Sequence, residues 1–146
     1  MKKRVPFTLL TLLAALVLLL SACGMFDQSS AEPVTLEEYA AGDPEIQEAI
    51  DSALTDSSVR IEISGNDIIY TFDLSIIEGY TEDVAKDEAI ISALESTLDG
   101  AGATYGGLAK NIESRTGIEG VRTIVNYSWE DEILVTHTYT SADAAS

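Results

Sequence analysis

The first half of the folded region has a helical pattern followed by two alternating runs. Thr35-Leu-Glu-Glu38 is typical of a capping box, in which the Thr hydroxyl and the Glu carboxylate each satisfy a free backbone amide. Asp43-Pro44 restarts a helix, with Asp as the N-cap and Pro at the first helical position. Its buried stripe is predicted to contain Ile46, Ala49, Ile50, Ala53 and Leu54. Val59–Ser64 and Ile68–Leu74 then alternate on either side of Gly65-Asn66-Asp67, which predicts a β-hairpin.

The second half repeats this order with a longer helix. Thr81-Glu82-Asp83 opens the helix, apolar positions recur every three or four residues, and Gly117 provides a C-terminal cap. Glycines interrupt the stripe, and each interior glycine costs about 1 kcal/mol relative to Ala, so a break there is the rival interpretation. The continuous phase favours one long, bent helix. Val121–Ser128 and Ile133–Thr140 alternate around Glu130-Asp131, which predicts a second hairpin.

Together these elements predict an α+β fold of helix, hairpin, long helix and hairpin. Because a sheet face needs a covering layer, we expect a four-stranded antiparallel sheet with both helices on one face. Glu48–Leu54 and Glu88–Leu94 agree at six of seven positions. This agreement is consistent with an internal duplication, or with two alanine-rich amphipathic helices that look alike by chance.

The N-terminal stretch has the parts of a bacterial signal peptide. Lys2-Lys3-Arg4 is basic, and Phe7–Leu20 is apolar but shorter than the roughly 20 residues that span a bilayer as a helix. Leu20-Ser21-Ala22-Cys23 is similar to the lipobox of bacterial lipoproteins, with small residues before a Cys. We therefore expect cleavage before Cys23 and a diacylglycerol thioether on its sulfur, with two acyl chains holding the protein. The alternative is an ordinary secreted protein whose cleavage site happens to adjoin a Cys.

The chain therefore divides into four regions. The sequence predicts a lipoprotein signal peptide at 1–22, a flexible tether at 23–34, a small α+β domain at 35–140 and a frayed tail at 141–146. With one Cys in the chain, a disulfide within the domain is excluded, so packing alone must stabilise it.

Charge narrows the range of partners. Three of the eight Lys and Arg residues precede Cys23, which leaves five against 25 Asp and Glu residues and a net charge of −20. A surface of this kind repels nucleic acid and anionic headgroups. We expect no nucleic-acid partner, and we expect lipid on Cys23, rather than charge attraction, to hold the protein at a membrane.

Several of these motifs together resemble a known family. They are Thr35-Leu-Glu-Glu-Tyr, Asp43-Pro-Glu-Ile-Gln, the strand pair around Gly65-Asn66 with Tyr70-Thr71, and Thr116-Gly-Ile-Glu-Gly-Val121. Over roughly Thr35 to Tyr139, the chain resembles a family of bacterial lipoproteins that carries a domain of unknown function (numbered 4854) and is common in Gram-positive bacteria. The resemblance implies a small α+β domain on the outer face of a cell membrane and supplies no catalytic residue.

No residue pattern in the chain indicates catalysis. His137 is the single histidine, and alternation places it on a strand face with Val135 and Tyr139, which is typical of a partly buried, hydrogen-bonded residue. One histidine without a free Cys excludes a typical zinc site. Gly100–Gly107 is glycine-rich but lacks the Lys-Ser/Thr pair of a phosphate-binding loop. We expect no catalytic residue, metal or cofactor, and the chain is not predicted to be an enzyme.

Arg60 and Arg122 are candidates for residues that face a partner. If their apolar neighbours point into the core, both arginines project from the other face of the sheet. One interpretation is cross-strand pairing of the arginines with Glu62 or Asp73, and the other is a pair of cations that faces a ligand or partner.

The sequence thus predicts a membrane-anchored, extracytoplasmic lipoprotein of the cell envelope whose domain is a non-catalytic binding or interaction module. Its partner would be an unidentified envelope protein or ligand. The alternative function is an inhibitor or accessory subunit of an envelope enzyme or transporter, acting through the exposed sheet face or an edge strand.

Overall fold

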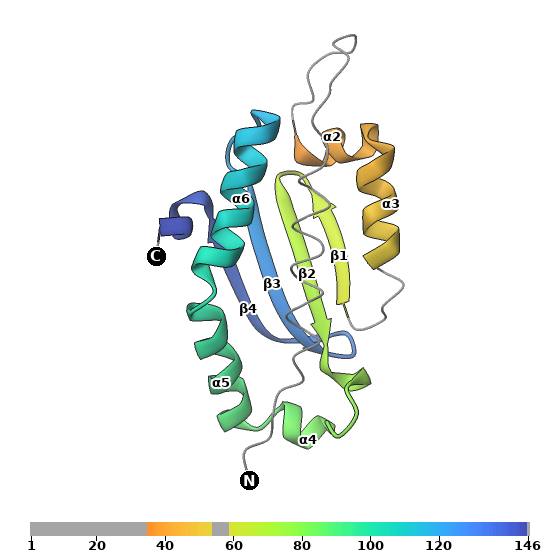
Figure 1. The fold of residues 1–146 in the computed structure, drawn as a ribbon. Coiled ribbons are helices and arrows are strands. Elements are labelled where there is room, and N and C mark those ends of the chain that lie inside the picture. The colour runs from red at the N-terminus through yellow and green to blue at the C-terminus, as the bar shows by residue number, and fades with distance from the viewer. Residues whose placement is uncertain (1–34, 54–58, 146) are drawn as a thin grey trace.

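Residues 35–53 and 59–145 are described in a computed structural model, in which helices pack on a four-stranded sheet (Figure 1). The elements in chain order are α2 (Leu36–Gly42), α3 (Pro44–Ala53), β1 (Val59–Ser64), β2 (Asp67–Asp73), the 3-10 helix η1 (Leu74–Ile76), α4 (Glu82–Ala85), α5 (Glu88–Asp99), α6 (Gly102–Thr116), β3 (Arg122–Trp129), β4 (Glu132–Thr140) and the 3-10 helix η2 (Ser141–Ala145).

The sheet has the strand order β1-β2-β3-β4, and its central pair is parallel. Both hairpins are antiparallel, whereas β2 and β3 run side by side from the pair Asp67 and Arg122 to the pair Asp73 and Ser128. The α+β class is confirmed, but the prediction of a fully antiparallel sheet is wrong at its centre. A parallel pair needs a crossover of a dozen or more residues, usually helical. The helices between β2 and β3 provide that crossover.

The long helix predicted after Thr81 is divided into α4, α5 and α6. Asp87 caps α5 by accepting a hydrogen bond from the Ala89 amide at 2.9 Å. The chain turns again at Gly100, so the break falls where the sequence placed its rival interpretation. Gly117 ends α6 with φ of 72°, in the left-handed conformation that favours glycine, as predicted.

Both predicted helix starts in the first half are confirmed. Thr35 Oγ1 accepts from the Glu38 amide and Glu38 Oε2 accepts from the Thr35 amide, each at 3.2 Å, so the capping box is formed. Asp43 Oδ1 accepts from the Glu45 amide at 2.9 Å, immediately before Pro44 opens α3. These local contacts fix where the first two helices begin.

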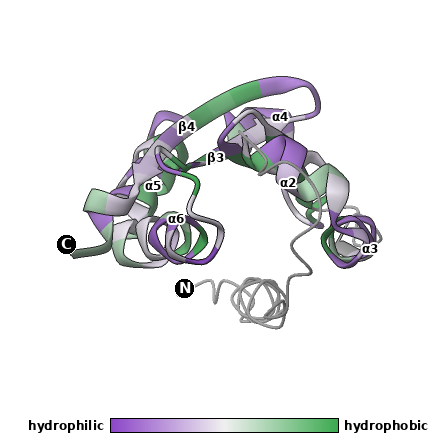
Figure 2. Ribbon diagram, turned by 90° about the horizontal axis from the view of Figure 1, so that it is seen from above, coloured by the Kyte–Doolittle hydropathy of each residue, from purple (hydrophilic) through white to green (hydrophobic). Residues whose placement is uncertain are grey.

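The core lies between the sheet and the helices beside it. Alternate strand residues are buried, among them Ile61, Tyr70 and Val125, and Leu108 and Ile112 of α6 pack into the same cluster. Figure 2 shows α3, α5 and α6 on the same side of the arched sheet. Within the part of the chain that the structure describes, no helix is both long and apolar enough to cross a membrane.

Some predicted regions lie outside the described residues. They are the signal peptide at 1–22, with Leu20, Ser21 and Ala22, the tether at 23–34, with Cys23, and Leu54 of the α3 stripe. At the other end, the residues expected to fray form η2, which lies against Gly106 of α6. The echo between residues 48–54 and 88–94 falls on α3 and α5, and the internal duplication stays a prediction.

Candidate binding groove

An apolar groove lies between α3 and α6 over the first hairpin and encloses a cavity of about 60 Å³. One wall is formed by Ala49 and Ile50 of α3, which the helical stripe turns toward the sheet. Ile63 of β1 and Tyr70 of β2 belong to the floor, and Ile112 of α6 belongs to the opposite wall. The groove therefore uses apolar residues from both halves of the chain.

The groove is open to solvent along part of its lining. The half-buried apolar residues of the lining are Tyr39, Ala49, Ile50 and Ile63. A ligand that covered these apolar side chains would remove them from water, which is favourable in free energy. Burial raises the pKa of the Tyr70 hydroxyl above its ordinary value, because the phenolate would lose its hydration. The lining is suited to an apolar surface of a ligand rather than to a polar one.

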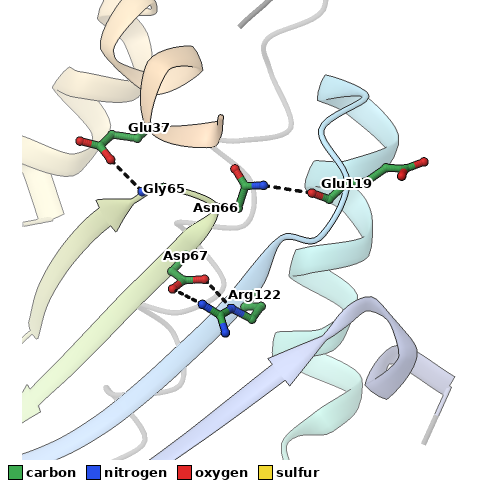
Figure 3. Close-up of polar contacts among 6 residues, drawn as sticks. All are labelled: Glu37, Gly65, Asn66, Asp67, Glu119 and Arg122. Carbon is green, nitrogen blue, oxygen red and sulfur yellow. Dashed lines mark hydrogen bonds and ion pairs between the residues drawn. The ribbon is translucent and has the colours of Figure 1, made fainter. Parts of the chain in front are cut away.

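A polar junction centred on the β1–β2 turn (Figure 3) contacts Leu36, one of the lining residues of the groove. Asn66 Oδ1 accepts from the Leu36 amide and Asn66 Nδ2 donates to the Glu119 carbonyl, both at 3.0 Å. Glu37 Oε2 accepts from the Gly65 amide at 2.7 Å, as Figure 3 shows. The turn thereby joins the start of α2 to the loop between α6 and β3.

The same loop is held by a second carboxylate. Glu113 Oε1 of α6 accepts from the amides of Gly120 and Val121, at 2.9 and 3.0 Å. Three of the sequence motifs, around Thr35, Gly65 and Thr116, therefore meet at one end of the sheet. Their shared role is to position α2 and α6, which carry part of the groove.

Sequence reasoning treated Asn66 as a turn residue and did not find the junction or the groove. The partners of Asn66 are 30 and 53 positions away in the chain, so no local pattern pairs them. A polar side chain between two hairpin strands is explained by turn chemistry alone. The helical spacing of Ala49 and Ile50 predicted a buried stripe, but it did not predict that these two residues would line a groove.

The sequence profile of one protein family, the domain of unknown function DUF4854, matches residues 36–139. The chain belongs to this family. The match covers α2 to β4 and therefore includes both the polar junction and the groove of the DUF4854 domain. A search of curated proteins and a search of solved structures each found no significant match.

The two arginines singled out in the sequence lie apart on the sheet of the DUF4854 domain. Arg60 is opposite Thr71, and Arg122 is beside Asp67, which is four residues from Thr71 along β2, or about 13 Å. Arg122 forms a bidentate ion pair with Asp67, with Nε–Oδ1 and Nη2–Oδ2 distances of 2.7 and 2.6 Å (Figure 3). This pairing raises the pKa of Arg122. Its partner is Asp67, and not Glu62 or Asp73 as the sequence suggested.

Arg60 has a weaker electrostatic role beside Asp73. Partial burial alone would raise the pKa of Asp73, but hydrogen bonds from Ser75 and the Glu130 amide outweigh burial, and the charge of Arg60 adds to them, so the pKa is lowered. The structure therefore does not assemble Arg60 and Arg122 into one cationic site.

His137 is half-buried beside the turn between α5 and α6. Its ring centroid lies 4.5 Å from that of Tyr139, and its Nδ1 lies 3.6 Å from Asp99 Oδ1. The contact with Asp99 links β4 to the end of α5, and the ring contact with Tyr139 lies within β4. Among the residues described, no three His, Cys, Asp or Glu side chains are grouped so that they could hold a metal ion.

Proposed function

We propose that the chain is an extracytoplasmic lipoprotein, cleaved before Cys23 and anchored in the cell membrane through a diacylglycerol thioether on that residue. The lipobox-like Leu20-Ser21-Ala22-Cys23 and the basic and apolar residues before it support this proposal. The net charge of −20 from Cys23 onward supports it as well, because an acidic domain is not drawn to an anionic membrane surface. Two acyl chains on Cys23 would supply the attachment that charge does not.

The DUF4854 domain on this anchor is proposed to be a non-catalytic binding module. The observation that carries the proposal is the groove, which keeps Ala49, Ile50 and Ile63 half-exposed beside a packed core. Exposed apolar patches in a concave setting are typical of ligand sites. A partner or ligand at the cell surface would cover this lining.

The lipid anchor is tested by metabolic labelling. Wild-type cells fed radioactive palmitate are expected to give a labelled, membrane-bound protein, and Cys23→Ala is expected to give neither label nor membrane retention. Retention of the label in Cys23→Ala would overturn the lipoprotein assignment.

The groove is tested in intact cells with a photo-crosslinking amino acid at single sites. Placed at Ala49, which lines the groove, the probe is expected to give a specific crosslinked adduct. Placed at Ala93, which is exposed on α5 and outside the groove, it is expected to give none. Equal yields at the two positions would contradict a ligand site in the groove.

A second function, as inhibitor or accessory subunit of an envelope enzyme or transporter, has its own support. This function assumes that the helices all lie on one face of the sheet, so that the partner binds to the opposite face. On that face Ile69 and Ile124 are half-buried and Thr136 and Thr138 are exposed, a mixture that suits a protein partner. A photo-crosslinker at Thr138 distinguishes the two functions, because an adduct there and none at Ala49 favours the accessory subunit.

A further inference from the structure

β1 is an edge strand of the sheet, and its outer side carries no partner strand. The strand order begins with β1, so within the described chain its neighbour in the sheet is β2 (Figure 1). Apart from its pairing with β2, no backbone hydrogen bond links β1 to another described segment. An edge strand presents a row of unpaired N–H and C=O groups, which is a template for pairing with another strand.

The other edge of the sheet, on β4, is less suited to pairing. The register between β3 and β4 shifts at Tyr127 and Ser128, and an irregularity of this kind bends an edge away from a regular partner. At the end of β4, the Thr140 amide donates to Asp143 Oδ2 of η2 at 2.7 Å. The register of β1 with β2 is regular along the whole strand, so β1 is the edge that fits an added strand.

The β1–β2 turn fixes which backbone groups of β1 point outward. Ser64 and Asp67 are opposite each other across a two-residue turn. The residues that flank such a turn form a hydrogen-bonded pair, and hydrogen-bonded and non-hydrogen-bonded pairs alternate from there. The N–H and C=O groups of Val59, Ile61 and Ile63 therefore point away from β2. These three residues are the ones that an added strand would pair with.

The side chains of β1 are complementary to a second copy of the same strand. Arg60 and Glu62 are both exposed, carry opposite charges and lie two positions apart, so they share a face of the strand. When β1 pairs antiparallel with β1 of a second copy about Ile61, Arg60 of each copy is opposite Glu62 of the other. One two-fold axis forms both pairs, as a symmetric dimer requires.

Charge also disfavours the neighbouring registers. Pairing about residue 60 would place the two Arg60 side chains opposite each other, and pairing about residue 62 would do the same for Glu62. Like charges directly opposite each other destabilise a strand pair, whereas opposite charges stabilise it. Pairing about Ile61 is also the register in which the outward-pointing residues all meet one another, because Val59 is then opposite Ile63.

Arg60 and Glu62 are available for ion pairs between copies. Arg122 is held by Asp67, whereas neither Arg60 nor Glu62 forms an ion pair with another residue that the structure describes. The acidic surface of the domain opposes association, but charges farther apart than about 8 Å are largely screened at physiological ionic strength. Side chains directly opposite each other have Cβ atoms only about 5 Å apart, so the Arg60–Glu62 attraction is screened less.

We infer that two copies of this chain pair antiparallel through β1 about Ile61, which joins their sheets and forms Arg60–Glu62 ion pairs between the copies. This inference goes beyond the proposed function, because the pairing requires neither lipid on Cys23 nor a ligand in the groove. Ile61 and Ile63 also line the groove, so the interface between the copies adjoins the groove of each.

The first test is disulfide trapping between two full-length chains with different epitope tags. One chain carries Arg60→Cys and the other carries Glu62→Cys, so the dimer of the two keeps one intact Arg60–Glu62 pair. Residues opposite each other at a non-hydrogen-bonded position have Cα atoms about 4.5 Å apart, which a disulfide can bridge. The chains are co-expressed, permeabilised cells are treated with copper phenanthroline, and chains with Cys23 alone give the background.

The mixed pair is expected to give at least about fivefold more disulfide-linked dimer than two Arg60→Cys chains or two Glu62→Cys chains. In the like pairs the two cysteines would be diagonal neighbours about 7–8 Å apart, which is too far for a disulfide without movement of the backbone. Equal yields would overturn the inference. A higher yield from a like pair would also overturn it, because it would indicate a register centred on residue 60 or 62.

The second test is charge exchange, measured by sedimentation of the purified full-length chain in detergent over a range of concentrations. Arg60→Glu is expected to weaken dimerisation about tenfold, because it creates two acidic pairs across the interface. Arg60→Glu combined with Glu62→Arg is expected to restore it. Lys110→Glu is the matched control, since it makes the same change in net charge on the exposed surface of α6 and should leave the dimer intact.

Three outcomes of the sedimentation test would overturn the inference. The first is a wild-type chain that stays monomeric at all concentrations. The second is a combined variant that dimerises no better than Arg60→Glu although circular dichroism shows that both are folded. The third is an equal loss in Lys110→Glu, which would attribute the effect to net charge rather than to the pairing of Arg60 with Glu62.

Discussion

The two helix–hairpin units of this DUF4854 domain are packed to different degrees. The first unit, residues 35–76, contains most of the groove, and the second unit, residues 82–145, contains the most completely buried side chains. The largest side chains with less than 2% exposure are Tyr139, Leu98, Val121, Val125, Thr123 and Ser128, all in the second unit. The second unit is thus the more closely packed of the two, while the first keeps apolar residues partly exposed in the groove.

Specific polar and steric contacts account for the tighter packing of the second unit. Tyr139 donates its hydroxyl to the Leu98 carbonyl at 2.6 Å, in addition to the Ala101 amide that donates to the same carbonyl at 2.9 Å. Thr123 Oγ1 donates to the Tyr105 carbonyl at 3.1 Å. Burial raises the pKa of Tyr139 to about 12, with smaller contributions from Tyr127 and nearby carboxylates. Among the described lining residues of the groove, the Thr116 hydroxyl donates to the Ile112 carbonyl at 2.8 Å, but this contact is only partly buried.

The largest expected effect comes from truncating one apolar side chain in each unit. Leu98→Ala should lower the free energy of unfolding by about 2–5 kcal/mol, because it leaves a cavity in a closed core. Ile50→Ala should cost about 1 kcal/mol or less, because Ile50 lines the open groove and is only half-buried. Urea denaturation followed by circular dichroism measures both. Equal losses would remove the contrast between the two units.

The next effect concerns two neighbouring glycines of α6. A Cβ on Gly106 would lie 2.6 Å from the Ala144 amide nitrogen and 2.8 Å from the Thr140 carbonyl oxygen, whereas a Cβ on Gly107 would have no neighbour within 4 Å. Gly106→Ala should therefore destabilise by about 1–3 kcal/mol by forcing η2 away from α6. Gly107→Ala should stabilise by up to about 1 kcal/mol through helix propensity. The difference in urea midpoint between the two variants is the measurement, and a stabilising Gly106→Ala would show that η2 does not pack on α6.

A smaller effect concerns two buried hydroxyl groups, of which that of Tyr139 forms a hydrogen bond and that of Ser128 does not. Tyr139→Phe should cost about 0.5–1.5 kcal/mol, because it removes the hydrogen bond from the Tyr139 hydroxyl to the Leu98 carbonyl, which keeps the Ala101 amide as a donor. Ser128→Ala is the control, since Ser128 Oγ is buried and has no hydrogen-bond partner among the residues described, and its removal should be neutral or slightly stabilising. Thermal unfolding compares the variants. If Ser128→Ala is the more damaging change, hydrogen bonds from buried hydroxyls do not account for the stability of the second unit.

The smallest expected effect lies at the seam between the units, where Asp73 accepts from the amides of Ser75 and Glu130 at 2.8 and 3.2 Å. Because the pKa of Asp73 is lower in the folded chain than in the unfolded chain, its contribution is present above the ordinary Asp pKa and is lost as pH falls through the lowered value. Asp73→Asn should therefore reduce the loss of stability on acidification. Urea midpoints from neutral to acidic pH test this, and an unchanged acid dependence would contradict it.

The local elements could be predicted from the sequence because their causes are local. The capping box at Thr35, the Asp43 cap, the Gly117 cap and the alternation of all four strands depend on neighbours within a few positions. A break at the glycines was the rival interpretation for the long helix. The apolar spacing favoured one continuous helix, because this spacing keeps its helical period across a short turn such as the one at Gly100.

The long-range features could not be predicted in the same way. The parallel pairing of β2 with β3 depends on how a long crossover packs, and the same alternating strands also fit an antiparallel neighbour. The ion pair of Arg122 with Asp67 follows from that pairing, so an antiparallel sheet suggested the wrong partners. The groove depends on the separation between two helix walls, which no single segment encodes. Cys23 and the signal peptide lie outside the described residues and stay predictions.

The parallel central pair also has a kinetic consequence. Asp67 and Arg122 are 55 positions apart, so β2 cannot acquire its inner neighbour until nearly the whole chain is available. Non-local pairing of this kind slows folding, to a timescale on the order of milliseconds or longer. During that interval the first hairpin presents an unpaired edge on β2, which is a template for association with other chains. Because the chain is synthesised from its N-terminus, the first hairpin is an aggregation-prone intermediate until β3 pairs with β2.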